Sequence, residues 1–254
     1  MIMASWSRRR KLAYALIALI IIVGAIIVPG FLLIYRPPTC SDGIKNGDEQ
    51  GIDCGGSCER LCQNVFLSPI VNWVRYEEIY PGVYNLAAYI ENPNPDVEAV
   101  NVPYHMVVYG PRALELANKT GTVTIPPHRP TLAFVGAVNL GKVAPVTSPF
   151  FEFTAAPEWH KRADPLAALS IGGQNYQEDE TGSSMTVTLK NSSVQAIYRV
   201  AVYVILYDKD KNVIGFSKTI VDQIPPLGSA VAPFTWPINR HGAVISQEVL
   251  PVAE

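Results

Sequence analysis

Two stretches of the chain carry the same pattern: residues 85–110 read NLAAYIENPNPDVEAVNVPYHMVVYG, and residues 184–208 read SMTVTLKNSSVQAIYRVAVYVILYD. The aligned positions are Asn92 with Asn191, Tyr109 with Tyr207 after one inserted residue in the first copy, and Ile125-Pro126-Pro127 with Ile224-Pro225-Pro226. An immunoglobulin-like β-sandwich is about 100 residues long, close to the spacing of the copies. The repeat therefore predicts two such domains in tandem.

The residues of these stretches favour strands. Met185, Val187 and Leu189 alternate with polar residues, which indicates a strand with one buried face and one exposed face. The following strand, at residues 200–207, is apolar on both faces. We therefore expect it to be central, or to be covered on its outer face. The chain beyond residue 64 is rich in Val, Ile, Thr and Tyr and is broken by Pro and Gly, so the predicted class is mainly β.

The region before the repeats predicts a membrane anchor. Residues 12–35 carry no charged side chain, and a helix of about 20 residues spans the hydrocarbon layer of a bilayer. Four basic residues, 8–11, precede this run and only Arg36 follows it closely. The positive-inside rule then places the N-terminus in the cytoplasm and the repeats outside the cell membrane, in a single-pass topology. The alternative is a cleaved signal peptide, but its apolar region should be about 7 to 15 residues long.

The exported part is acidic. Five of the 20 Lys and Arg residues precede residue 37, which leaves 15 against 22 Asp and Glu, a net charge near −7. This charge argues against nucleic acid as a ligand. The predicted boundaries are a basic cytoplasmic tail at 1–11, the transmembrane helix at 12–35, a cysteine-rich collar at 36–63, a first sandwich at 64–157, a linker with the first strand region of the second sandwich at 158–180, and the remainder of that sandwich at 181–254, its domain starting near 165.

All four cysteines lie in the collar, at Cys40, Cys54, Cys58 and Cys62. Outside the cytoplasm thiols oxidise, so an even number in a short segment predicts two disulfides. Four cysteines allow three pairings, and the sequence does not choose among them. A zinc site is the alternative, but the spacing C-x13-C-x3-C-x3-C lacks the paired C-x2-C units of zinc sites.

The collar also holds candidate calcium ligands, at Asp42, Asn46, Asp48 and Asp53. Their side chains offer oxygen ligands, and glycines between them would let a loop wrap around a cation. The spacing is not that of an EF-hand, and Asp-Gly and Asn-Gly are also ordinary turn dipeptides. Calcium is therefore the one cofactor that the sequence suggests, and a string of turns is the alternative.

Two resemblances agree with export. Residues 40–62, CSDGIKNGDEQGIDCGGSCERLC, resemble a cysteine-rich motif of exported bacterial surface proteins, roughly C-x-DG-x-x-NG-x-E-x-G-x-DCGG-x-C-x-x-C, with three residues rather than two before the last cysteine. The second repeat resembles the FxLYD family of small immunoglobulin-like domains of exported prokaryotic proteins. The residues that carry this second resemblance are Asn191, Val204-Ile205-Leu206-Tyr207-Asp208 with valine for the first aromatic, Ile214-Gly215, and Ile224-Pro225-Pro226-Leu227-Gly228 before Phe234. Neither resemblance implies catalytic residues.

No catalytic pattern stands out. The four histidines are scattered, and neither G-x-S-x-G nor H-E-x-x-H occurs. We predict a non-enzymatic surface protein whose collar spaces two sandwiches from the membrane, for adhesion or for assembly of an envelope complex with a protein partner. The alternative is a solute-binding or enzymatic accessory subunit with a site between the domains. The linker residues expected at that site are Trp159, His160, Asp164, Glu178 and Asp179.

An aromatic cluster lies near the start of the first domain. Its members are Trp73, Tyr76, Tyr80, Tyr84 and Tyr89. Exposed aromatic residues can form a recognition surface, but sandwich strands are where such residues are normally enriched. We expect them to lie in the core or in a contact between domains.

Overall fold

A computed structural model describes residues 3–34, 39–58, 60–141, 145–161 and 164–254, and it divides into two compact units, 1–60 and 61–254. The predicted end of the membrane helix and start of the collar, at 35–38, lie outside the described residues, as do the side chains of Arg8 and Arg9. Helix α1 (Met3–Ile34) contains a stretch of 21 residues, Arg10–Gly30, with a mean hydropathy of 2.8. At 1.5 Å per residue this stretch is about 30 Å long, enough to cross a bilayer. A signal sequence has the same properties.

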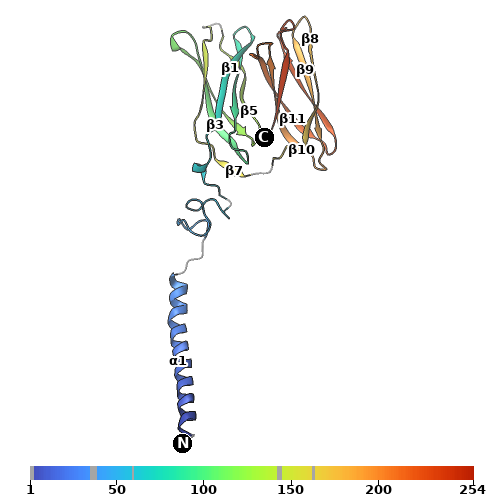
Figure 1. Cartoon of the computed structure of the whole chain (residues 1–254). Coiled ribbons are helices and arrows are strands. Elements are labelled where there is room, and N and C mark those ends of the chain that lie inside the picture. The colour runs from blue at the N-terminus through green and yellow to red at the C-terminus, as the bar shows by residue number, and fades with distance from the viewer. Residues whose placement is uncertain (1–2, 35–38, 59, 142–144, 162–163) are drawn as a thin grey trace. The chain divides into compact units, whose positions relative to one another are not determined.

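The first sandwich, in the second unit, has two antiparallel sheets (Figure 1). One sheet has the order β1-β2-β5, and the other has the order β4-β3-β6, with β7 also paired to β3. The strands are β1 (Ile70–Tyr80), β2 (Val83–Glu91), β3 (Val97–Tyr109), β4 (Glu115–Ile125), β5 (Thr131–Asn139), β6 (Ser148–Phe153) and β7 (Trp159–Lys161), and the short 3-10 helices are η1 (Gln63–Val65) and η2 (Pro111–Ala113). Inward-facing residues such as Leu86, Met106 and Ile125 form its core.

The second sandwich repeats this plan. One sheet has the order β8-β9-β12 and the other β11-β10-β13. The strands are β8 (Leu169–Glu178), β9 (Ser183–Asn191), β10 (Ile197–Tyr207), β11 (Val213–Ile224), β12 (Ser229–Trp236) and β13 (Ser246–Ala253). As the alternation predicts, Met185, Val187 and Leu189 are buried in its core. The chain is therefore mainly β, with two tandem sandwiches.

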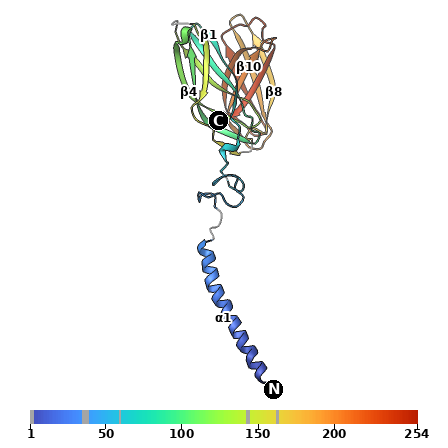
Figure 2. The same cartoon turned by 60° about the vertical axis from the view of Figure 1, so that its left-hand side comes forward.

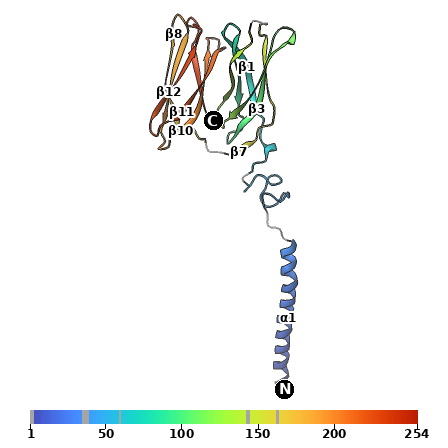
Figure 3. The same cartoon turned by 180° about the vertical axis from the view of Figure 1, so that it is seen from behind.

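The two sandwiches pack against each other through one sheet of each. The sheet β1-β2-β5 faces the sheet β11-β10-β13, as the front and back views show (Figures 1 and 3). The turned view places β4 and β8 on the two outer sides (Figure 2). Strand β10 is thus covered on both faces, by its own sandwich and by the other one. This confirms the expectation drawn from its apolar residues.

Candidate functional site

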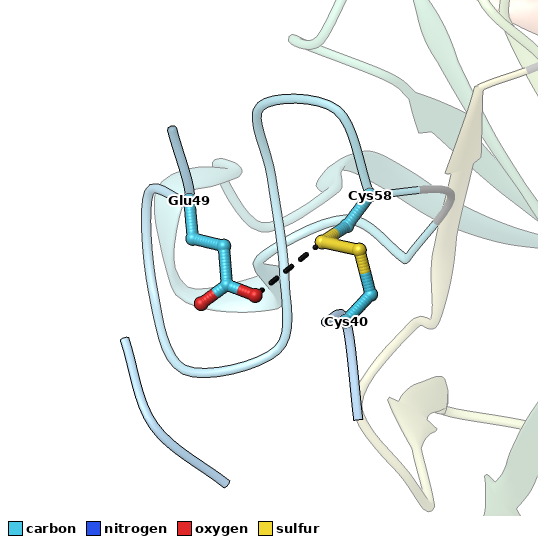
Figure 4. Close-up of side chains that lie close together, drawn as sticks. All are labelled: Cys40, Glu49 and Cys58. Atoms are coloured by element: carbon cyan, nitrogen blue, oxygen red, sulfur yellow. Dashed lines mark hydrogen bonds between the residues drawn. A yellow bond between two sulfur atoms is a disulfide. The ribbon is translucent and has the colours of Figure 1, made fainter. Parts of the chain in front are cut away.

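The collar contains two disulfides, as predicted. Cys40 and Cys58 are bonded with a Cα–Cα distance of 5.6 Å, and Cys54 and Cys62 are disulfide-bonded as well. Glu49 lies beside the first of these bonds, with Oε1 3.5 Å from Cys58 Sγ (Figure 4). Sulfur atoms in a disulfide hold no proton and no free thiolate. This cluster is therefore no metal site in the oxidised protein, and the zinc alternative is excluded for that form.

The four predicted calcium ligands make hydrogen bonds within the collar. Asp53 accepts from the Gly43 N–H through both carboxylate oxygens, at 3.1 and 2.9 Å. Asp42 accepts from the Ile44 N–H and from Asn46 Nδ2, and the Asn46 bond lowers the pKa of its carboxyl group. Asp48 instead accepts from Ser57 Oγ at 2.7 Å. These bonds are typical of turns, and calcium binding stays a prediction that calorimetric titration would test.

The contact between the sandwiches is a third apolar core. The first sandwich contributes Trp73, Ala87, Tyr89, Leu132 and Phe134, and the second contributes Ala201, Tyr203, Ile205, Tyr207, Val213, Phe216, Leu250 and Val252. Phe216 packs against Trp73 and Phe134, with ring centroids 6.3 Å apart in both pairs. The aromatic cluster thus supplies this contact through Trp73 and Tyr89 and the first core through Tyr84, whereas Tyr76 and Tyr80 are exposed.

Buried polar groups join the two sandwiches at this contact. Glu77 on β1 forms an ion pair with Arg240, and its other carboxylate oxygen accepts from the Phe216 N–H at 3.1 Å. Burial raises the pKa of Glu77, and the Arg240 charge opposes that rise. A Cβ atom at Gly215 would collide with the Arg240 guanidinium, so any other residue there would require the Arg240 side chain to shift.

A second carboxylate bridges the contact. Glu248 on β13 accepts from the hydroxyl of Tyr89, in the first sandwich, at 3.0 Å and from that of Tyr207 at 2.7 Å. Burial, together with the neighbouring carboxylate, raises the pKa of both tyrosines. Together with the Glu77–Arg240 pair, these bonds fix the relative orientation of the two sandwiches at their apolar contact.

An interdomain groove opens beside the contact, with a volume of about 560 Å³. Its polar lining comprises Asn101, Thr122 and Thr124 from β3 and β4, Arg199, Tyr203 and Lys218 from β10 and β11, and Glu254. None of these residues stands out as a site in the sequence. One signal was present: Arg199 is a charged residue at the start of an otherwise apolar strand.

The linker residues expected at an interdomain site do not meet there. Trp159 is buried against Phe66, and Asp164 pairs with Arg129. Glu178 accepts from the Tyr176 hydroxyl and from the Gly242 N–H, while Asp179 caps the turn at 181–182. His160 is exposed on β7, and the other four residues are hydrogen-bonded or buried at separate places.

Comparison with known proteins leaves the family open. No family model matches the chain, and no curated protein matches it, so the FxLYD resemblance stays a prediction. Among solved structures, a β-glucuronidase of glycoside hydrolase family 2 has 10% identity over 87% of this chain and 29% of its own, with a TM-score of 0.25. The Parabacteroides merdae β-glucuronidase has 11% identity over 68% and 28%, with a TM-score of 0.19.

A third similar structure is the N-terminal CBM22-1-CBM22-2 tandem domain of Paenibacillus barcinonensis Xyn10C. It has 8% identity over 74% of this chain and 86% of its own, with a TM-score of 0.15. The chain spans less than a third of the length of the two β-glucuronidases. Likenesses of this size support no statement about function.

Proposed function

We propose that this chain is a non-catalytic, membrane-anchored extracytoplasmic protein that presents its two sandwiches as one rigid body to a protein partner, in adhesion or in assembly of an envelope complex. The observation that carries the proposal is the contact between the sandwiches, which buries apolar side chains and the Glu77–Arg240 pair. Domains joined only by a linker move relative to one another by default, whereas a large apolar interface holds them. A rigid body can offer a partner surfaces from both domains at a fixed spacing.

The anchored, extracytoplasmic placement is supported by helix α1 and by the disulfides. We place the N-terminus in the cytoplasm and assign the sandwiches to the FxLYD type as part of the same proposal. Protease added to intact cells should digest the sandwiches if this topology holds. Digestion only after the membrane is breached would contradict it.

Affinity capture from native membranes with matched variants tests whether a partner exists and whether it needs both sandwiches. Leu132 is fully buried in the contact, whereas Val231, its counterpart in the second repeat, is 57% exposed on the outer sheet. Leu132→Asp should separate the sandwiches and abolish capture of a partner that needs both, while Val231→Asp should retain it. A partner captured equally by both variants would show that rigidity is not needed. No specific partner across several conditions would overturn the assembly role.

A further inference from the structure

Tyr203 lines the interdomain groove and is only 5% exposed. Its ring packs in the contact between the sandwiches, and Lys218 Nζ lies 5.5 Å from the ring centroid. Although the residue is buried, its hydroxyl is not among the enclosed polar atoms, and no hydrogen bond joins it to another described residue. Burial and the Glu254 charge raise its pKa, so the hydroxyl stays protonated at neutral pH. It is therefore a donor available to a molecule in the groove.

The charged side chains that line the groove are Arg199, Lys218 and Glu254. Lys218 is neutralised by Glu254, with Nζ 2.5 Å from Oε1. The Arg199 side chain is exposed in the groove and makes no hydrogen bond or ion pair with the residues that the structure describes. Arginine presents paired N–H donors that match a carboxylate or a phosphate. Arg199 is therefore the side chain in the groove that is suited to an oxyanion.

The backbone directs a polar side chain from each sandwich to this groove. Asn101 and Arg199 occupy equivalent positions of the two repeats, and both have left-handed φ angles, 54° and 50°. Residues other than glycine seldom adopt this conformation, and it persists where the surrounding structure requires it. Both residues line the same groove. Each repeat thus contributes one residue with a left-handed φ angle to the groove.

We propose that the interdomain groove binds a small polyhydroxylated molecule that carries a carboxylate or a phosphate. Arg199 pairs with the oxyanion, the Tyr203 hydroxyl donates a hydrogen bond to it, and Asn101, Thr122 and Thr124 offer groups for hydrogen bonds to ligand hydroxyls. A volume of about 560 Å³ is within the range of small-molecule sites. This site is independent of the assembly role, and either can fail without the other.

Calorimetric titration and ligand-observed NMR on the full chain in detergent test the site. The probes are D-glucuronate, glucose 1-phosphate and, as the neutral control, D-glucose. We expect at least one oxyanion probe to bind about tenfold or more tightly than glucose, because charge-assisted hydrogen bonds are the stronger ones. The probe that binds more tightly identifies the oxyanion as carboxylate or phosphate.

Two variants assign the binding to named groups. Arg199→Asn should weaken oxyanion binding about tenfold, and Tyr203→Phe should weaken it by about three- to tenfold while keeping the ring. Asparagine already occupies the equivalent left-handed position at Asn101, so Arg199→Asn should fold. The control is Arg112→Asn, the same substitution at another exposed left-handed arginine outside the groove. The proposal is overturned if neither oxyanion binds at about 10 mM, if glucose binds equally well, or if Arg199→Asn and Tyr203→Phe leave binding unchanged.

Discussion

Asn92 and Asn191 make the same hydrogen bonds in the two sandwiches. Asn191 Nδ2 donates to the carbonyls of Gln195 and Pro225 at 2.7 and 3.1 Å, and its Oδ1 accepts from the Ser193 N–H. Asn92 donates to the carbonyls of Val97 and Pro126 at the same two distances, and it accepts from the Asn94 N–H. The aligned Asn and Pro positions of the sequence repeat are thus one structural device, which ties two loops to the end of a strand.

Replacing Asn191 should therefore be costly. Asn191 is 2% exposed, and Asn191→Ala removes the donor that ties the Gln195 and Pro225 carbonyls to the strand end, so we expect a loss of about 2 to 4 kcal/mol in the free energy of unfolding. Denaturant unfolding of the full chain measures it. The matched control is Asn175→Ala, at an exposed position on β8, which should change stability by less than about 0.5 kcal/mol. Equal losses for the two variants would contradict the assigned role.

The Glu77–Arg240 pair allows a sharper test. The two side chains are 7% and 9% exposed, and removing one partner of a buried pair leaves an uncompensated charge. Glu77→Met alone and Arg240→Met alone should each cost about 3 to 5 kcal/mol, whereas the variant that combines them should recover most of that loss. Thermal melting of the single and double variants forms the cycle. Purely additive effects would show that the two side chains act independently.

The collar shows how a segment without its own apolar core is held together. Cys40 and Cys58 are 18 residues apart, and closing a loop of that length stabilises the folded form by about 3 kcal/mol in the chain-entropy account. The hydrogen bonds of Asp42, Asp48 and Asp53 then shape the turns between the cysteines.

The pairing makes a direct prediction. Digestion of protein purified without reductant should yield a peptide containing Cys40 joined to one containing Cys58, and mass spectrometry identifies it. The Cys40→Ser/Cys58→Ser variant should lose the collar's resistance to protease while the sandwiches keep theirs. Four free thiols, or a Cys40–Cys54 linkage, would refute the arrangement.

The two sandwiches meet through different sheets, so the contact could in principle continue to a further domain or to another copy of the chain. The outer sheet of the second sandwich presents a different surface from the contact sheet of the first. Its register places Thr186, Thr188, Val231 and Pro233 where the first sandwich has Ala87, Tyr89, Leu132 and Phe134. Two threonines thus take the places of Ala87 and Tyr89, and the exposed Val231 and Pro233 take those of Leu132 and Phe134.

Thermal unfolding should distinguish the contact sheet of the first sandwich from the outer sheet of the second. With the contact intact, the sandwiches should unfold in one cooperative transition. Leu132→Asp places a charge in the contact and should split the transition in two or lower the midpoint markedly, because an unpaired buried charge is strongly unfavourable. Val231→Asp, at the exposed equivalent position, should leave a single transition. Differential scanning calorimetry of the two variants decides, and identical traces would contradict a rigid contact.

Local sequence patterns were enough to predict the apolar helix, the two sandwiches and the presence of disulfides. The charge-free run at 12–35 predicts an apolar helix, the spacing of Asn92 and Asn191 predicts two similar sandwiches, and the even number of cysteines in the collar predicts disulfides. Each of these properties depends on residues close together in the chain or on a repeat that reads directly from the letters.

The tertiary structure decided the rest, because it depends on which distant surfaces meet. The partner of Cys40, the pairing of Glu77 with Arg240 and the groove that gathers Asn101, Arg199 and Tyr203 all join residues far apart in sequence. The apolar residues on both faces of β10 predicted only that another part of the protein covers its outer face. Two sheets bury apolar area against each other only when their whole faces are complementary. The tertiary structure shows that the sheet that covers β10 belongs to the first sandwich.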